Sequence, residues 1–402
     1  MLRLPPFKLL RPRTLAEAAA MLADEGAAAG RAVRLVAGGT DLWPNMKRRH
    51  QKAATVVSLM GIPGLAGIGN GRHHARAGEE DGGEVRLGAT TLLDGVARNP
   101  LVAARYPALA TAVASISSPP LRNMGTIGGN VCVDTRCTYY NQTEEWRRAI
   151  DYCMKEEGTI CWVATSSPRC WAHSASDSAP MLCALGARVR LVSRQDEREV
   201  AVEALYRDDG IDYLAKRPDE IVAEILLPAG AGAARCRSAF WKLRRRGSID
   251  FAVLSVGAAL WFDGDEEGGA GRAGGANGGE DRTGAGPRAL GESLAGRVVS
   301  QARIYLGAVG SYPLPAAAAA DCLVGRPLSA ETIAEAARLA RRVATPMDNT
   351  DFQAQWRSVM VGRYAEAALR EIAGLAPERL PPRHLPAAGP DRAEAARARD
   401  RH

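Results

Sequence analysis

The sequence predicts a mixed α+β fold, for three reasons that concern different parts of the chain. Residues 1–60 alternate between helical and strand patterns, which is typical of a small α/β subdomain. The following part, to about residue 235, mixes strands with Ala-rich helices and contains a cysteine-dense segment, 132–172. The C-terminal part places strands before helices, as an α+β domain does. We therefore expect a small α/β subdomain at the N-terminus and an α+β domain at the C-terminus.

The composition limits the classes of function. A chain of 402 residues with 46% hydrophobic residues can bury a sizeable core in two or three domains. The net charge of +7 is spread along the chain, aromatic residues make up 5%, and no zinc-finger or aromatic-plus-basic pattern is present, so nucleic-acid binding is not expected. The charge is better explained by a solvated surface that attracts an acidic partner or a phosphorylated cofactor. No apolar run reaches transmembrane length and the N-terminus lacks the apolar core of a signal peptide, so a cytoplasmic location is expected.

The first special stretch follows an N-terminal helix and a strand. Thr14-Leu-Ala-Glu17 is a capping-box pattern that begins the helix, and strand 33–37 ends at Gly38-Gly39-Thr40-Asp41. Adjacent glycines permit positive φ and a close approach to a ligand, and successive backbone N–H groups in such a turn can hold an anion. The stretch thus predicts a diphosphate site, although it is neither a Walker A loop nor a Rossmann fingerprint. An ordinary turn between two elements is the alternative.

A second glycine-rich stretch lies at 122–130. Strands are expected at 56–59 and 84–90, and helices at 91–97 and 100–115. Arg122-Asn-Met-Gly-Thr-Ile-Gly-Gly-Asn130 then places three glycines within five residues, beside the polar side chains of Thr126 and Asn130. Two such loops in one domain favour a shared ligand with a long phosphate-bearing body. A second tight turn is the alternative.

Six of the eight cysteines lie between positions 132 and 183. The segment between them is polar and aromatic and cannot build a core of its own, so a metal staple is expected. Four thiolates suit zinc or an iron–sulfur cluster, but the gaps are wide and contain no Cys-x-x-Cys, which leaves the metal open and unligated thiols as the alternative. Cys183, Cys236 and Cys322 are interpreted as small core residues, and Cys132 is ambiguous.

The C-terminal half is expected to begin with strands and to end with helices. We predict strands at 251–261 and 303–309, a flexible Gly-rich hairpin tip at 263–288, a last helix at 353–372, and a disordered tail at 375–402. Residues 313–342 are predicted to be mainly helix, with a second part that starts at Ser329 or Thr332.

The two glycine-rich stretches carry a resemblance to a known family. Leu35–Leu42 and Arg122–Asn130 resemble the two flavin loops of the FAD subunits of molybdenum hydroxylases, a family that includes the flavoproteins of xanthine dehydrogenase and carbon monoxide dehydrogenase. Ser176-Asp177-x-x-Pro180 resembles the acidic motif that follows in this family. Lys242–Arg246 and Asp250–Ala252 resemble the start of its C-terminal domain. The resemblance implies an FAD-binding domain over 1–235, with a small subdomain at 1–60, and a C-terminal domain over 236–374.

The cysteine segment narrows the resemblance. Asn130–Gln142 resembles the insertion of the β subunit of 4-hydroxybenzoyl-CoA reductase, and Asp348–Asp351 and Trp356-Arg357 are also similar to that subfamily. The resemblance implies an iron–sulfur insertion over 132–172 that holds a [4Fe–4S] cluster. Its implied ligands are Cys137, Cys153, Cys161 and Cys170.

The resemblance also implies roles for the residues that bind FAD. Backbone N–H groups of the first loop would surround the diphosphate, and the second loop would form the opposite wall. Asp177 would bond a flavin hydroxyl, with a helix N-cap as an alternative or additional role. Lys242 would lie near the isoalloxazine, where a cation stabilises reduced flavin, or be a surface lysine, and the backbone at Val222 would meet the adenine. The implied FAD-binding residues are Leu35, Val36, Ala37, Gly38, Gly39, Thr40, Asp41, Leu42, Thr126, Gly128, Gly129, Asn130, Asp177, Val222 and Lys242.

The function implied by the resemblance is electron transfer without acid–base catalysis by this chain. Electrons from a ferredoxin-like donor would pass through the [4Fe–4S] cluster and FAD to a [2Fe–2S] small subunit and a molybdopterin-containing large subunit, in a dimer of heterotrimers. The reaction would be the reductive removal of the ring hydroxyl of 4-hydroxybenzoyl-CoA, giving benzoyl-CoA. The alternatives are the FAD subunit of another molybdenum hydroxylase, of the xanthine or CO dehydrogenase type, and a non-catalytic scaffolding subunit with a zinc-stapled loop.

Overall fold

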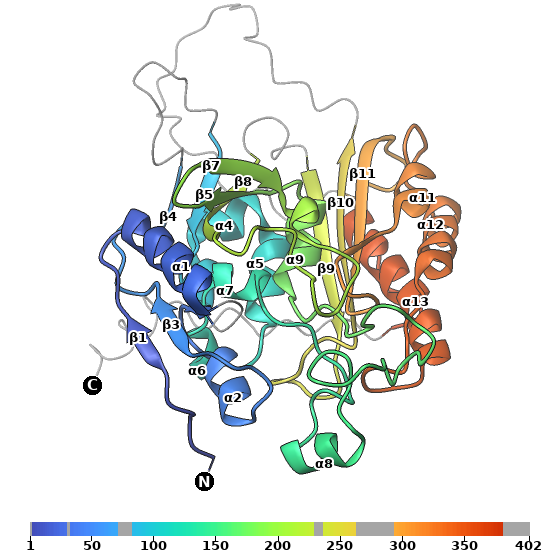
Figure 1. The fold of residues 1–402 in the computed structure, drawn as a ribbon. Helices are drawn as coiled ribbons and strands as arrows, with labels where there is room; N and C mark the ends of the chain where they lie inside the picture. The colour runs from blue at the N-terminus through green and yellow to red at the C-terminus, as the bar shows by residue number, and fades with distance from the viewer. Residues whose placement is uncertain (1, 30–32, 71–82, 229–235, 263–292, 381–402) are drawn as a thin grey trace, which may run out of the picture.

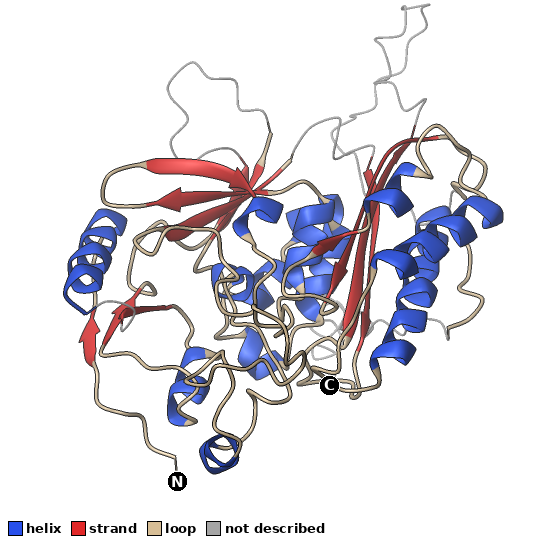
Figure 2. Ribbon diagram, turned by 45° about the vertical axis from the view of Figure 1, so that its right-hand side comes forward, coloured by secondary structure: helices blue, strands red, loops and turns tan. Residues whose placement is uncertain are grey.

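Three β-sheets with helices packed against them form the framework of the described part of the chain (Figures 1 and 2). The computed structural model describes residues 2–29, 33–70, 83–228, 236–262 and 293–380. The predicted Gly-rich hairpin tip at 263–288 and residues 381–402 of the predicted tail lie outside the described residues.

The first sheet is small and parallel, as the sequence predicts. Its strands are β1 (Lys8–Leu10), β2 (Val33–Val36) and β3 (Thr55–Ser58), in the order β1-β3-β2, and its helices are α1 (Leu15–Ala29) and α2 (Leu42–Lys47). Half of the predicted capping box is present, because the Glu17 N–H donates to Thr14 Oγ1 over 3.1 Å. The Glu17 carboxylate reaches back one residue further than the box requires and accepts from the Arg13 N–H over 2.7 Å. Ala18, Ala19 and Leu22 form the buried face of α1.

The second sheet has five strands and is antiparallel throughout. Its order is β4-β5-β8-β6-β7, with β4 (Ile68–Asn70), β5 (Val85–Gly88), β6 (Arg188–Val192), β7 (Glu197–Ala201) and β8 (Ile221–Leu227). The helical elements of this part are α3 (Leu93–Arg98), α4 (Pro100–Arg105), α5 (Pro107–Ala114), α6 (Pro119–Arg122), α7 (Ile127–Val131), α9 (Ser178–Ala184) and the 3₁₀ helix η2 (Val202–Leu205). The single helix predicted over 100–115 is wrong, because Pro107 has no N–H to continue α4 and instead begins α5.

The third sheet forms the C-terminal part together with three helices. Its order is β12-β11-β10-β9, all antiparallel, with β9 (Cys236–Leu243), β10 (Leu254–Phe262), β11 (Val299–Gly307) and β12 (Leu314–Pro315). Helices α11 (Ala317–Asp321), α12 (Ala330–Val343) and α13 (Ala354–Ala373) lie on one face, and α5 and α9 pack against the sheet from the other side (Figure 1). The helical stretch predicted over 313–342 consists of two parts, α11 and α12, and Gly325 between them has φ +74°. The predicted start of the second part at Ser329 is confirmed, because Ser329 is the N-cap of α12 and forms a capping box with Thr332.

The cysteine segment contains one short helix, α8 (Glu144–Ala149), and otherwise consists of turns. Arg147 on α8 is fully buried and forms ion pairs with Glu144 and Glu156, and it also donates to the Arg48 carbonyl oxygen over 2.7 Å. These polar contacts join the segment to the rest of the domain. The prediction that the segment builds no core of its own is wrong, because Cys137, Tyr140, Cys153, Cys170 and Ala172 form a small buried cluster within it.

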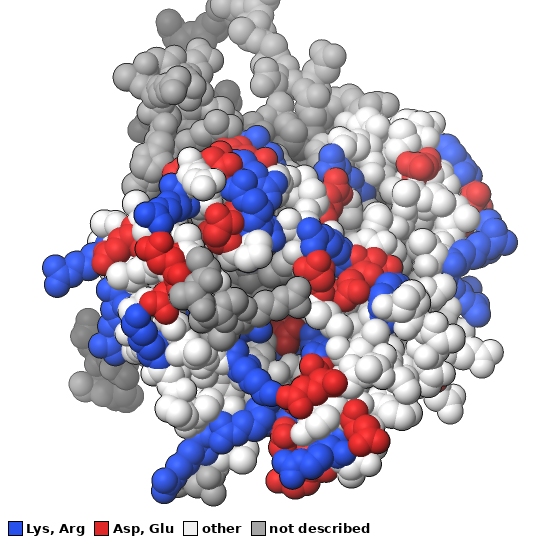
Figure 3. All heavy atoms as spheres, in the orientation of Figure 1, with Lys and Arg blue, Asp and Glu red and all other residues white. Residues whose placement is uncertain are grey.

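The surface charge is mixed. On the face seen in Figure 3, Lys and Arg alternate with Asp and Glu and do not gather into one basic patch. This agrees with the interpretation of the net charge as a property of a solvated surface. Within the described ranges, no helix combines the length and the apolar character needed to span a bilayer.

Arg357 on α13 is a buried cation that binds backbone carbonyl oxygens. Its guanidinium donates to Val253 over 3.0 and 3.1 Å, to Met347 over 2.7 Å and to Ala308. These carbonyl groups belong to segments far apart in the sequence, so one side chain joins the start of β10, the end of β11 and the turn before α13.

The substitution Arg357→Met should lower the free energy of unfolding by roughly 3 kcal/mol, because it leaves several buried carbonyl groups without a donor. The urea midpoint of the variant measures this loss. Arg338→Met is the matched control, since Arg338 lies on the neighbouring helix with a half-exposed side chain and a 4.0 Å ion pair. Equal midpoints for the two variants would contradict the assignment.

Candidate cofactor site

The first loop, Leu35–Leu42, follows β2 at the carboxyl end of a parallel strand, where open α/β sheets bind ligands. Gly39 has φ +70°, a conformation that favours glycine. A Cβ atom on Gly38 would lie 1.7 Å from the carbonyl oxygen of Met124. Gly38 therefore allows the backbone of the first loop to touch the backbone of the second loop, whereas Gly39 supplies the turn and leaves room for the Trp43 side chain.

The second loop, Arg122–Asn130, turns into the short helix α7. Thr126 caps this helix, because its Oγ1 accepts from the Gly129 N–H over 3.1 Å. A Cβ on Gly128 would lie 2.6 Å from the Cβ of Ala89, and the Gly128 N–H donates to the Ala89 carbonyl over 2.9 Å. The loop is thus pressed against the end of β5 on one side and against the first loop on the other.

The two loops line one large cavity, with a volume of about 1080 Å³. This is at the upper end of the range for ligand sites, about 300–1,000 Å³, and suits an elongated ligand. We call it the loop cavity. The predicted residues that line it are Leu35, Val36, Ala37, Gly38, Gly39, Thr40, Asp41, Leu42, Thr126, Gly128, Gly129, Asn130, Asp177 and Val222. Lys242 is not among the lining residues.

Asp177 presents an unpartnered carboxylate oxygen in this cavity. The side chain is 3% exposed, and its Oδ2 accepts from the Lys242 ammonium over 2.7 Å. Its Oδ1 is buried and has no hydrogen-bond partner, which is unusual for a buried polar atom and points to a bound ligand. Burial raises the pKa of Asp177, and the ammonium of Lys242 opposes that rise.

Two predicted roles change in the structure. Asp177 occupies the N-cap position of α9 but makes no side-chain capping bond, so the predicted hydrogen-bonded N-cap is wrong. Lys242 is buried and donates to the carbonyl oxygens of Ser115 and Asp250 as well as to Asp177. It is therefore not a surface lysine, and it meets the loop cavity through Asp177.

The first loop is joined to the cysteine segment by an ion pair. Arg136 pairs with Asp41, donates to Asn45 Oδ1 over 3.1 Å, and lies 5.1 Å from the ring centroid of Phe251. Arg136 is 6% exposed and directly precedes Cys137. The position of Cys137 thus depends on the first loop.

The four cysteines singled out by the resemblance lie around a second, small cavity. Cys137, Cys153, Cys161 and Cys170 are all buried and all line this space, which we call the cysteine cavity. A hydrogen bond between the side chains of Cys161 and Cys170 lowers the pKa of Cys161 to about 5 and raises that of Cys170.

The cysteine cavity is not arranged for a single metal ion. In the described part of the chain, no three His, Cys, Asp or Glu side chains form a group that could hold one ion. The volume between the thiols, about 10 Å³, is close to that of one water molecule. The structure thus brings the four predicted cysteines together but does not place them at single-ion ligand distances.

Comparison with known proteins identifies the fold family. Residues 5–230 match the family described as the FAD binding domain in molybdopterin dehydrogenase, and residues 288–372 match the CO dehydrogenase flavoprotein C-terminal domain. The chain belongs to this FAD-binding family. It is the FAD subunit of a molybdenum hydroxylase-type enzyme.

Individual relatives agree with this assignment. The carbon monoxide dehydrogenase medium chain of Hydrogenophaga pseudoflava is 24% identical over 91% of this chain and 96% of its own length. The nicotinate dehydrogenase FAD-subunit of Eubacterium barkeri is 25% identical over 81% of this chain and 82% of its own length. A solved structure of the Hydrogenophaga pseudoflava carbon monoxide dehydrogenase superposes with a TM-score of 0.66 at 24% identity, over 93% of this chain and 100% of that chain, which shows a shared fold.

The loop cavity is also lined by residues that no sequence pattern indicates. Ile211, Asp212, Tyr213, Leu214 and Lys216 line the loop cavity from an irregular polar segment after η2. The Tyr213 hydroxyl donates to the Cys132 carbonyl over 3.0 Å, and burial lowers the pKa of Lys216. The segment has no glycine pattern or periodicity of its own, so nothing in the sequence marked it.

Cys132 and Cys183 lie apart from the cysteine cavity. Cys132 lines the loop cavity, and burial raises the pKa of its thiol to about 11. Cys183 on α9 is buried in the main core of the domain, which confirms its interpretation as a core residue.

The substitution Gly38→Ala should reduce the FAD content of the purified protein at least about tenfold, because its Cβ would separate the two loops, and tenfold corresponds to only about 1.4 kcal/mol. Flavin absorbance per polypeptide measures the effect. Gly61→Ala is the matched control, since a Cβ there meets nothing within 4 Å. Full flavin content in Gly38→Ala would show that contact between the loops is not needed.

Proposed function

We propose that this chain is the flavin and [4Fe–4S] electron-transfer subunit of a molybdenum-dependent 4-hydroxybenzoyl-CoA reductase. The observation that carries the proposal is the gathering of Cys137, Cys153, Cys161 and Cys170 around one buried cavity, in an insertion that the resemblance assigns to that enzyme. The family membership supplies the flavin part of the proposal.

The loop cavity fits FAD. Backbone N–H groups of Leu35–Leu42 would hold the diphosphate, with Thr126, Gly128, Gly129 and Asn130 on the opposite wall. The free Oδ1 of Asp177 would accept from a flavin hydroxyl, and the backbone at Val222 would meet the adenine. Lys242 would act on the flavin through Asp177. FAD, when bound, supplies a carrier that accepts and donates one or two electrons.

The chemistry of the cysteine cavity fits an iron–sulfur cluster better than a single ion. Thiolates are the usual ligands of such clusters, and each thiolate of a four-iron cluster binds a different iron. The ligands therefore stand further apart than those of zinc, so the absence of a single-ion arrangement does not oppose a cluster. The enclosed space is small, so loading requires the four side chains to move outward.

The partners follow from the same proposal. Relatives named as a medium chain and an FAD-subunit are components of larger enzymes. We infer a [2Fe–2S] small subunit and a molybdopterin-containing large subunit, in a dimer of heterotrimers, with the organic substrate bound by the large subunit. Electrons from a ferredoxin-like donor would enter on the side of the cysteine cavity and leave from the side of the loop cavity.

Metal analysis tests the cluster. Protein purified without oxygen should contain about four iron and four sulfide per chain, as the cluster formula requires. The substitution Cys161→Ser should remove most of both, whereas Cys322→Ser, at a cysteine that does not line the cysteine cavity, should keep them. Zinc without sulfide would replace the proposal with the zinc-stapled alternative.

The substrate is tested with the whole complex. The chain purified with its partner subunits and supplied with a reduced viologen should convert 4-hydroxybenzoyl-CoA to benzoyl-CoA, as followed by chromatography of the thioesters. The matches to carbon monoxide and nicotinate dehydrogenase subunits favour the second candidate, a subunit that serves oxidation of another substrate. Oxidation of carbon monoxide or nicotinate with a dye acceptor, and no benzoyl-CoA, would select that candidate.

A further inference from the structure

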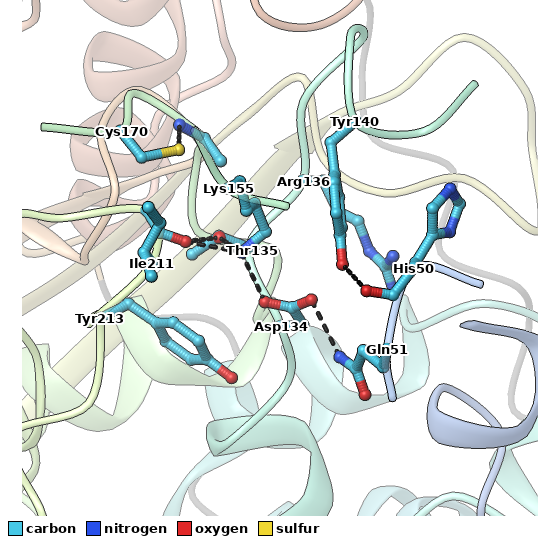
Figure 4. A network of polar contacts seen from close by, with 12 residues as sticks. His50, Gln51, Asp134, Thr135, Arg136, Tyr140, Lys155, Cys170, Ile211 and Tyr213 are labelled. Carbon is cyan, nitrogen blue, oxygen red and sulfur yellow. Dashed lines mark hydrogen bonds and ion pairs between the residues drawn. The ribbon is translucent and has the colours of Figure 1, made fainter. Parts of the chain in front are cut away.

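One wall separates the cysteine cavity from the loop cavity. Among the described residues, Tyr140 and Lys155 line both cavities. Figure 4 shows these two side chains with the polar groups that surround them. Lys155 lies two positions after Cys153, and Tyr140 lies three positions after Cys137. The wall is therefore built from the insertion itself.

The ammonium group of Lys155 is fixed from several directions. Its Nζ donates to Asp134 Oδ1 over 2.8 Å, to Thr135 Oγ1 over 2.8 Å and to the Gly210 carbonyl over 2.6 Å (Figure 4). Its side chain is 5% exposed and that of Asp134 is 9% exposed. The ring centroids of Tyr140 and Tyr213 lie 5.1 and 5.7 Å from Nζ, within the range of a cation–π contact.

A backbone segment completes the wall beside Lys155. The Gly210 N–H donates to the Cys170 carbonyl over 2.9 Å, and a Cβ on Gly210 would lie 2.7 Å from Cys170 Sγ. The next residues, Ile211 to Leu214, line the loop cavity. The chain thus passes from contact with a cysteine of one cavity to the surface of the other within a few residues.

A buried ion pair in this place adds little stability compared with well-packed apolar groups, because desolvation offsets the attraction. What it does supply is a fixed charge in a medium of low dielectric constant, where charges interact more strongly than in water. A positive charge near a redox centre favours the form that holds the additional electron. A neighbouring carboxylate has the opposite effect.

We propose that Lys155 is a positioning residue whose fixed charge, balanced by Asp134, sets the reduction potentials of the redox centres in the two cavities. The inference rests on the proposed function. Each transfer would remove one electron from the cluster and add it to the FAD. A low-potential one-electron donor would then return one electron to the cluster. The proton that reduced flavin takes up comes from water.

The experiment is a charge-neutralisation series on the holoprotein. Lys155→Met should shift the midpoint potential of the cluster to more negative values, and Asp134→Asn should shift it to more positive values. The double variant should return close to the wild-type potential, and Lys155→Arg should keep it. Redox titrations followed by electron paramagnetic resonance for the cluster and by absorbance for the flavin measure the shifts. Lys52→Met is the control, since the Lys52 side chain is 71% exposed and its charge is screened by salt.

Opposite shifts of the two single variants support the proposal, because a loss of packing would not change sign with charge. Unshifted potentials in iron-loaded variants overturn it and leave the proposed function intact. Wild-type protein without iron and sulfide overturns both. If the Lys155→Met variant loses its iron, the Asp134→Asn variant tests the proposal alone. A positive shift of its cluster midpoint potential supports the proposal, and an unchanged midpoint potential overturns it.

Discussion

The site depends on a contact between two backbones that only glycine permits. Gly38 meets the carbonyl of Met124 at a distance that leaves no room for a Cβ, and Gly128 meets Ala89 in the same way. These contacts bring together the end of a strand in the parallel sheet and a loop that packs on the antiparallel sheet. The loop cavity forms between them. Polar side chains such as Asp177 can face a ligand there only because the backbones on both sides are held in place.

The cysteine segment, residues 132–172, is connected to this framework by polar contacts. Arg136 pairs with Asp41 of the first loop, and Asn349 contacts both ends of the insertion: its carbonyl accepts from the Thr138 N–H over 2.8 Å and its side chain donates to the Trp171 carbonyl over 2.6 Å. Thr138 and Trp171 adjoin Cys137 and Cys170. The cysteine cavity is therefore positioned from the flavin-like loop on one side and from the C-terminal part on the other.

Local patterns in the sequence predicted much of this, and the failures have physical causes. Turn chemistry placed both glycine loops, and periodicity placed α1, α13 and most strands, because these signals lie within a few neighbouring residues. The Ala-rich run around Pro107 predicts one helix, but a proline has no N–H to continue a helix and Pro107 begins a new one. Residues Ile211 to Lys216 could not be found, since an irregular segment becomes part of a cavity only through tertiary packing. The capping role of Asp177 failed because its carboxylate pairs with Lys242, 65 positions away.

Buried charges act more strongly than exposed charges on a group bound in either cavity. The surface carries both signs in alternation (Figure 3), and charges exposed to physiological salt are screened within about 8 Å. In the interior, Lys155 faces Asp134, Arg136 faces Asp41 and Lys242 faces Asp177. Each of these three cations has a carboxylate beside it, so each pair is close to neutral. Removing one member of a pair leaves an unbalanced charge that little water can screen, whereas removing both restores neutrality. Because each buried cation is paired with a carboxylate, a single residue can determine the electrostatic potential nearby. No large net charge is then needed next to either cavity.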